Sequence, residues 1–188
     1  MTKAGYIAFF LLVLSACRKD ERITASTAPT PYFPELPVGF PLPAVPDDNP
    51  LTLEGVRLGK ALFFSKALSR DGSVSCASCH HVDRAFSDTV ALSLGVQGAV
   101  GFRNSPTLAN MAYHPAYFKD GGVPSLELQV LAPVHDPLEM DHDILAVAAD
   151  LKDQEPFRSL SMKAYDRELD PYVITRAIAS YERTLISG

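Results

Sequence analysis

The run Cys76-Ala77-Ser78-Cys79-His80 constrains this chain more than any other part of its sequence. Two thiols three positions apart, followed directly by an imidazole, form the C-x-x-C-H pattern of covalent c-type haem attachment. Each thiol adds to one vinyl group of the porphyrin, and a histidine nitrogen then binds the iron from beneath the ring. The sequence therefore predicts thioethers at Cys76 and Cys79 and an axial iron ligand at His80.

Two other uses of paired cysteines fit this sequence less well. A structural zinc site needs four nitrogen or sulfur ligands, and the third cysteine, Cys17, lies in a different kind of segment. A thioredoxin-like redox pair needs a βαβ setting, which the sequence pattern does not indicate. Attachment of one covalent haem is the favoured interpretation.

Residues 1–16 have the pattern of a lipoprotein signal peptide. Lys3 gives a positive start, and the apolar stretch over 6–14 is too short to span a bilayer. The stretch ends in Leu14-Ser15-Ala16-Cys17, which predicts cleavage before Cys17 and lipidation of its thiol. An ordinary secretory signal with an incidental cysteine is the alternative. We expect a protein of the bacterial cell envelope, on the periplasmic or surface side, with a lipid anchor in the membrane.

The remaining chain divides into a linker and one domain. Eight of the 15 prolines lie within residues 29–50, so residues 17–50 are expected to form an extended, proline-rich tether. Residues 51–188 are long enough for one globular domain with its own core. The formal net charge of −5 argues against a nucleic-acid partner, which would need a basic patch.

Hydrophobic periodicity predicts helices and no convincing strand. Asp170 as N-cap and Pro171 at the first helical position predict a helix that continues to Leu185. The glycine-rich stretch 82–107 predicts a long loop that wraps the cofactor. Other helices are expected over 54–68, at the cysteine motif, over 125–131 and over 141–151. The expected fold is all-α, with a class I cytochrome c-like domain and long loops around one haem.

Several further motifs follow one another in a recognisable order. Together with the cysteine motif, they resemble the N-terminal, peroxidatic haem domain of bacterial di-haem cytochrome c peroxidases and of their methylamine-utilisation-type relatives. The resemblance covers nearly all of the chain after the tether. The matching runs are 58–64, 75–80, 85–88, 103–110, 118–122, 133–140 and 177–187.

The resemblance implies roles for four residues. His80 matches the proximal ligand of the peroxidatic haem, and Glu139 matches the distal acid–base glutamate. Gln129 matches a glutamine that lines the same pocket. Asn104 matches a ligand of a calcium ion near the boundary between two haem domains.

The residues around Glu139 support its acid–base role, but alternatives stay open for Glu139 and for a second axial ligand. Apolar neighbours such as Leu138 would desolvate the Glu139 carboxyl and raise its pKa toward the range useful for proton transfer. An exposed acid at a helix start is the competing interpretation of Glu139. His81, His114 and Met140 are weaker candidates for a second axial ligand, and an open distal face is favoured.

The sequence differs from the family pattern in three ways. Val96 stands where some members have a removable distal histidine, so the oxidised protein is expected to need no reductive activation. Lys119 stands where the family often has a tryptophan between the haems, and the chain contains no tryptophan. The resemblance does not extend to a second haem domain. The chain is therefore interpreted either as a truncated product or fragment, or as a stand-alone single-haem version.

The expected function is that of a haem c peroxidase. It would reduce hydrogen peroxide with electrons from a small periplasmic donor such as cytochrome c or a cupredoxin. The alternatives are a mono-haem electron-transfer protein without catalysis and a defunct fragment that accepts no electrons. An absorption spectrum separates the first two, because an electron carrier needs a strong sixth ligand to the iron.

Overall fold

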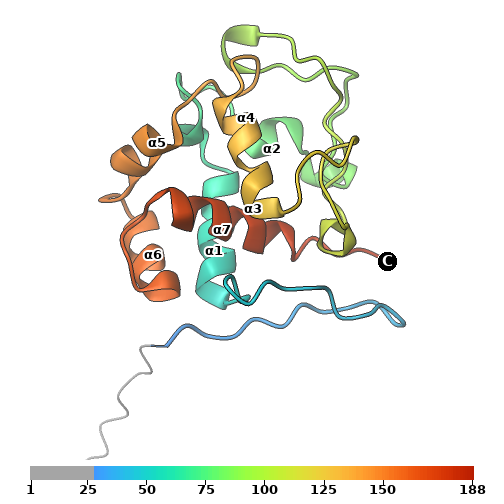
Figure 1. Ribbon diagram of the computed structural model, residues 1–188. Helices are drawn as coiled ribbons and strands as arrows, with labels where there is room; N and C mark the ends of the chain where they lie inside the picture. Colours follow the sequence, from blue (N-terminus) through green and yellow to red (C-terminus); the bar gives the residue numbers. More distant parts are fainter. Residues whose placement is uncertain (1–27) are drawn as a thin grey trace, which may run out of the picture.

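The computed structural model describes residues 28–188, so the predicted signal peptide and Cys17 lie outside the described residues. This part of the chain is helical and has isolated β-bridges but no paired strands (Figure 1), which confirms the all-α prediction. None of its helices is both long enough and apolar enough to cross a membrane. The α-helices are α1 (Leu53–Phe63), α2 (Cys76–Cys79), α3 (Leu126–Gln129), α4 (Leu131–His135), α5 (Ile144–Leu151), α6 (Phe157–Tyr165) and α7 (Pro171–Glu182).

Helices α1 and α7 pack against each other at the centre of the domain. A side chain on Gly59 of α1 would place its Cβ 1.8 Å from the carbonyl oxygen of Ala177 in α7, so only glycine allows this close approach. The N-terminus of α7 has the predicted cap, because the Asp170 carboxylate accepts a hydrogen bond of 2.8 Å from the amide of Val173. Thr52 caps α1 in the same way, with a bond of 3.1 Å from the amide of Gly55.

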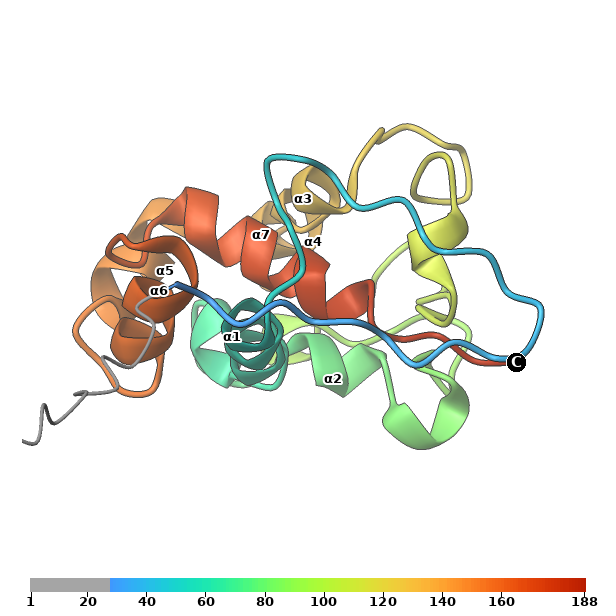
Figure 2. The ribbon, with the colours of Figure 1, turned by 90° about the horizontal axis from the view of Figure 1, so that it is seen from below.

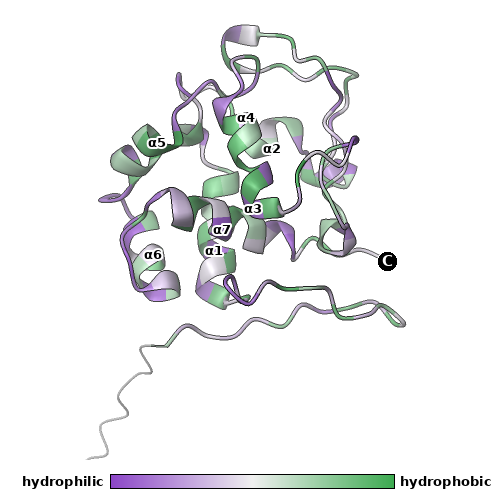
Figure 3. Cartoon of the chain, viewed as in Figure 1, coloured by the Kyte–Doolittle hydropathy of each residue, from purple (hydrophilic) through white to green (hydrophobic). Residues whose placement is uncertain are grey.

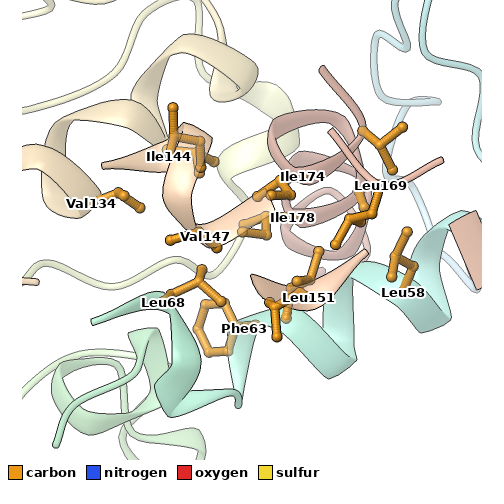
Figure 4. Close-up of a cluster of buried hydrophobic side chains, with 14 of the residues drawn as sticks. Leu58, Phe63, Leu68, Val134, Ile144, Val147, Leu151, Leu169, Ile174 and Ile178 are labelled. Carbon is orange, nitrogen blue, oxygen red and sulfur yellow. The ribbon is translucent and has the colours of Figure 1, made fainter. Parts of the chain in front are cut away.

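The core fills the space between these two helices and α5. Figure 4 shows side chains from α1, α5 and α7 meeting there, and Figure 3 shows apolar residues on the inward faces of these helices. Leu58, Phe63, Val147 and Ile174 are completely buried. Burial of a side chain of this size contributes about 1.5–3 kcal/mol, so this cluster is a large source of stability.

Residues 28–50, part of the predicted tether, are extended but lie against the helices (Figure 2). The side chain of Asn49 is fully buried and donates hydrogen bonds to Glu127 (2.7 Å) and to the Arg176 carbonyl (3.1 Å). Near the start of this segment, the Thr30 amide donates a hydrogen bond of 2.8 Å to the Glu54 carboxylate of α1. Burial alone would raise the pKa of Glu54, but its hydrogen bonds to Thr30 and Lys163 lower it to about 2.

Several helix boundaries differ from the sequence prediction, and one helix was not predicted. The last helix ends at Glu182 rather than at Leu185. The first helix ends at Phe63 rather than at Leu68, and a separate 3-10 turn covers Lys66–Leu68. The helix predicted over 125–131 is two short helices, α3 and α4, and the second extends to His135 past Pro133. Pro133 occupies the first turn of α4, where its missing N–H would have no helical partner. Helix α6 was not predicted, since its buried face includes the small residues Ser161 and Ala164.

Candidate haem site

The cysteine motif forms its own short helix, α2, as predicted. The Ser75 amide donates a hydrogen bond of 3.0 Å to the Ser78 hydroxyl, which closes the first turn. Cys76 and Cys79 are free thiols, and both line the same pocket. Burial raises the pKa of each thiol, so both are neutral before any reaction.

His80 is held by the chain that follows it. Its Nδ1 lies 2.8 Å from the carbonyl oxygen of Phe86, and because a carbonyl only accepts, Nδ1 carries the proton. Ala85 and Phe86 reach this position with left-handed φ values of 52° and 59°. Burial lowers the pKa of His80, which favours the neutral ring that binds metals. The Nε2 lone pair is thus the one available for iron, and the bond from Nδ1 fixes the ring orientation.

One pocket of about 750 Å³, open to solvent, brings the predicted residues together. Its wall contains Cys76, Cys79 and His80, together with Gln129 at the end of α3 and Glu139 from the loop after α4. Other parts of the wall are apolar, including Val74, Leu108, Val130, Val134 and Ile178. Two thiols and a neutral imidazole in a largely apolar pocket fit a covalently bound haem.

The described residues contain no group of three or more His, Cys, Asp and Glu side chains that could hold a metal ion. Within this part of the chain, the two cysteines therefore lack the further ligands that a structural zinc site of this kind requires.

The backbone around Glu139 is fixed by the glycine-rich loop. The Val96 amide donates a 2.8 Å hydrogen bond to the Glu139 carbonyl. A Cβ on Gly95 would lie 2.1 Å from the Leu138 carbonyl oxygen, so the contact requires glycine. Desolvation, followed by the charge of Asp136, raises the pKa of Glu139. The direction is the one expected from its apolar neighbours, but Glu139 is exposed to solvent, as the competing interpretation of an exposed acid predicted.

The other candidate ligands divide between pocket and surface. Met140 is buried and lines the pocket, whereas His81 and His114 are not part of its wall. Val96, which stands in place of a removable histidine, is buried and also lies outside the wall. His81 instead lies beside Asp88, with 3.6 Å between Nε2 and Oδ1.

Asn104 also lies outside the pocket wall. Its side-chain amide donates a hydrogen bond of 3.2 Å to the Val90 carbonyl. Its neighbour Arg103, which does line the pocket, forms an exposed ion pair of 3.1 Å with Asp120. A calcium-binding role for Asn104 stays a prediction.

One pocket residue was missed at the level of the sequence. Glu182, the last residue of α7, is buried and lines the pocket four positions after Ile178. The signal was present in this spacing, because positions i and i+4 of a helix share a face. In the sequence, Glu182 stands out only as a member of the matching run 177–187.

The fold and the pocket together define a helical domain built to hold a c-type haem. Its family can be stated more closely: the chain belongs to the di-haem cytochrome c peroxidase family, whose model matches residues 53–188. Membership of this family implies haem c as the cofactor.

Individual relatives agree with this assignment. The methylamine utilization protein MauG of Methylophilus methylotrophus is 40% identical over 144 residues, which cover 76% of this chain and 43% of the relative. Cytochrome-c peroxidase IdrP1 of Pseudomonas sp. (strain SCT) is 37% identical over 171 residues, which cover 87% of this chain and 43% of the relative.

A solved structure shows the same arrangement. The crystal structure of a MauG-like protein associated with microbial copper homeostasis superposes with a TM-score of 0.77 at 32% sequence identity, covering 83% of this chain and 47% of that chain. The chain thus spans less than half the length of these relatives.

Proposed function

We propose that this chain is the peroxide-reducing haem domain of a cytochrome c peroxidase. The observation that supports this proposal best is one shared pocket, whose wall contains Cys76, Cys79 and His80 together with Gln129 and Glu139. Reduction of one hydrogen peroxide molecule to two water molecules consumes two electrons and two protons. The electrons would come from a small periplasmic protein such as cytochrome c or a cupredoxin.

Each residue of the pocket has a distinct task in this proposal. Cys76 and Cys79 would hold the haem covalently and His80 would bind its iron; when bound, the haem supplies the redox chemistry of O–O cleavage. The Glu139 carboxylate would accept a proton from one peroxide oxygen and deliver it to the other, which then leaves as water. The Gln129 amide would orient peroxide by hydrogen bonding.

The substitution Glu139→Gln tests the proposed mechanism. Glutamine keeps the shape of the side chain but cannot shuttle a proton, and general acid–base groups typically contribute a factor of about 10²–10⁴ in rate. We expect peroxide consumption by the haem-loaded protein to slow by that order, measured by stopped-flow absorption. Glu168→Gln, at an exposed position outside the pocket, is the matched control. A Glu139→Gln protein that reacts as fast as wild type contradicts the mechanism.

The electron-carrier alternative makes a different spectroscopic prediction. An open distal side gives a high-spin, five-coordinate ferric haem, whereas a carrier with a closed distal side gives a low-spin spectrum. Met140 is the side chain in the pocket wall that could serve a carrier as a soft sixth ligand. A low-spin spectrum that Met140→Leu converts to high spin would favour the carrier.

We further propose that the protein acts in the cell envelope, tethered through a lipid on Cys17. The support is the export pattern of residues 1–16 and the requirement of c-type haem attachment for a compartment outside the cytoplasm. Cys17→Ser should move the protein from the membrane fraction to the soluble fraction. Wild-type protein found only in the soluble fraction would contradict lipidation.

A further inference from the structure

Glu182 is a buried acid that the proposed mechanism does not use. Its side chain lies in the pocket wall with Cys76 and Ile178, and only 4% of the residue is exposed. Its Oε2 atom is buried and has no hydrogen-bond partner in the described part of the chain. Because an isolated carboxylate is costly to bury, this position needs a reason beyond packing.

No positively charged side chain forms an ion pair with Glu182 in the described part of the chain. The adjacent Arg183 is committed to Glu127, which accepts two hydrogen bonds of 2.6 and 3.0 Å from its guanidinium. Glu182 is also the last residue of α7, where the negative end of the helix dipole disfavours another negative charge. Cys76, Tyr117 and Tyr181 also interact with it and are neutral, whereas the carboxylate of Glu127 adds a negative charge nearby.

These features have a clear effect on its protonation. Desolvation raises the pKa of Glu182 to about 8; Arg183 opposes the rise and Glu127 adds to it. Near neutral pH the group is therefore close to a balance between the neutral acid and the carboxylate. A nearby change of one elementary charge is enough to shift that balance.

We propose that Glu182 compensates changes of charge at this pocket. Its side chain takes up a proton when the bound haem is reduced and releases the proton when the haem is oxidised. The proposal rests on the haem-binding function proposed above. In the ferric state, the net positive charge at the iron stabilises the Glu182 carboxylate. One electron from the donor removes that charge, and the carboxylate takes one proton from water to become a neutral acid, so that charge within the pocket is conserved.

The pH dependence of the haem midpoint potential tests the proposal directly. The pKa of Glu182 should be higher with ferrous haem than with ferric haem. Between these two pKa values, the midpoint potential should fall as the pH rises. The slope approaches 59 mV per pH unit where one proton accompanies one electron. Glu182→Gln keeps the size of the side chain without titrating, and should flatten this slope between pH 6 and 9. Glu168→Gln, exposed and outside the pocket wall, should keep it.

A wild-type slope that persists in Glu182→Gln would overturn the proposal. An infrared difference spectrum between reduced and oxidised wild-type protein provides a test that needs no variant protein. It should contain a carboxylic acid carbonyl band in the reduced state, and its absence also overturns the proposal. Neither measurement involves peroxide, so both test the proton uptake by Glu182 separately from the peroxidase function. The peroxidase function is tested by the kinetics of Glu139→Gln.

Discussion

At the scale of single residues, the proposed role of Glu139 makes a prediction about how peroxide reduction depends on pH. Its raised pKa follows from desolvation and from the nearby charge of Asp136. Only the carboxylate accepts a proton from peroxide, so we expect the rate to fall as pH decreases through this raised pKa. Rates of peroxide consumption between pH 4 and 8 measure the effect, and Glu139→Gln should abolish this limb of the profile. A profile that is unchanged in Glu139→Gln would assign the titration to another group.

The buried pair of Glu127 and Arg183 makes a prediction about stability. Both side chains are nearly inaccessible, and Asn49 adds a third hydrogen bond to the same carboxylate. Breaking a buried ion pair by removing one partner typically costs about 3–5 kcal/mol, because the other charge stays buried. Glu127→Ala should lower the free energy of unfolding by that amount in denaturant titrations. The exposed control Glu168→Ala should change it by less than about 0.5 kcal/mol.

Sequence reasoning was strongest for residues whose chemistry depends on near neighbours. The spacing of Cys76, Cys79 and His80 was enough to predict one shared site, and the pocket gathers all three. Glu182 was missed because its environment is made by other elements. Its burial depends on the packing of α7 against the rest of the domain, and its lack of an ion pair depends on the commitment of Arg183 to Glu127.

At the scale of helices, the crossing of α1 and α7 depends on Gly59. A Cβ at this position would meet the Ala177 backbone carbonyl at 1.8 Å, and a helical backbone cannot move aside as a flexible side chain can. Overpacking of this kind costs about 1–3 kcal/mol or more. Gly59→Ala should therefore lower the melting temperature strongly in thermal denaturation. Gly101→Ala should have little effect, since its Cβ would meet its nearest neighbour at 3.5 Å; equal melting temperatures for the two variants would contradict this account.

Local sequence signals explain why α7 could be predicted and α6 could not. Helix α7 has a capping aspartate, a proline at its first position and a continuous apolar stripe, so local signals define it. Helix α6 follows Pro156, has no side-chain cap and buries the small residues Ser161 and Ala164. Its start therefore lacks a local sequence signal, and its position is set by packing against α1, which is a tertiary effect.

At the scale of the whole molecule, the domain combines a helical body with a loop-built wall. The body consists of α1, α5, α6 and α7 around the buried cluster (Figures 1 and 4). Most of the pocket wall comes from residues 74–80, 129–140 and α7, and a further part is formed by residues 81–107, which have only short 3-10 turns and isolated bridges as regular structure. Several of these residues, including Ser93, Gly95 and Ser105, line the pocket.

This division predicts how the protein responds when haem attachment is prevented. The double substitution Cys76→Ser and Cys79→Ser removes both thioethers but leaves the contacts between α1 and α7 intact. Amides in α1 and α7 should therefore stay protected from hydrogen exchange, because their opening requires disruption of the main core. Amides in residues 81–107 should exchange much faster than in the haem-loaded protein, since their ordering depends on contacts across the pocket. Equal loss of protection in the helices and the loop would show instead that haem attachment stabilises the domain as one cooperative unit.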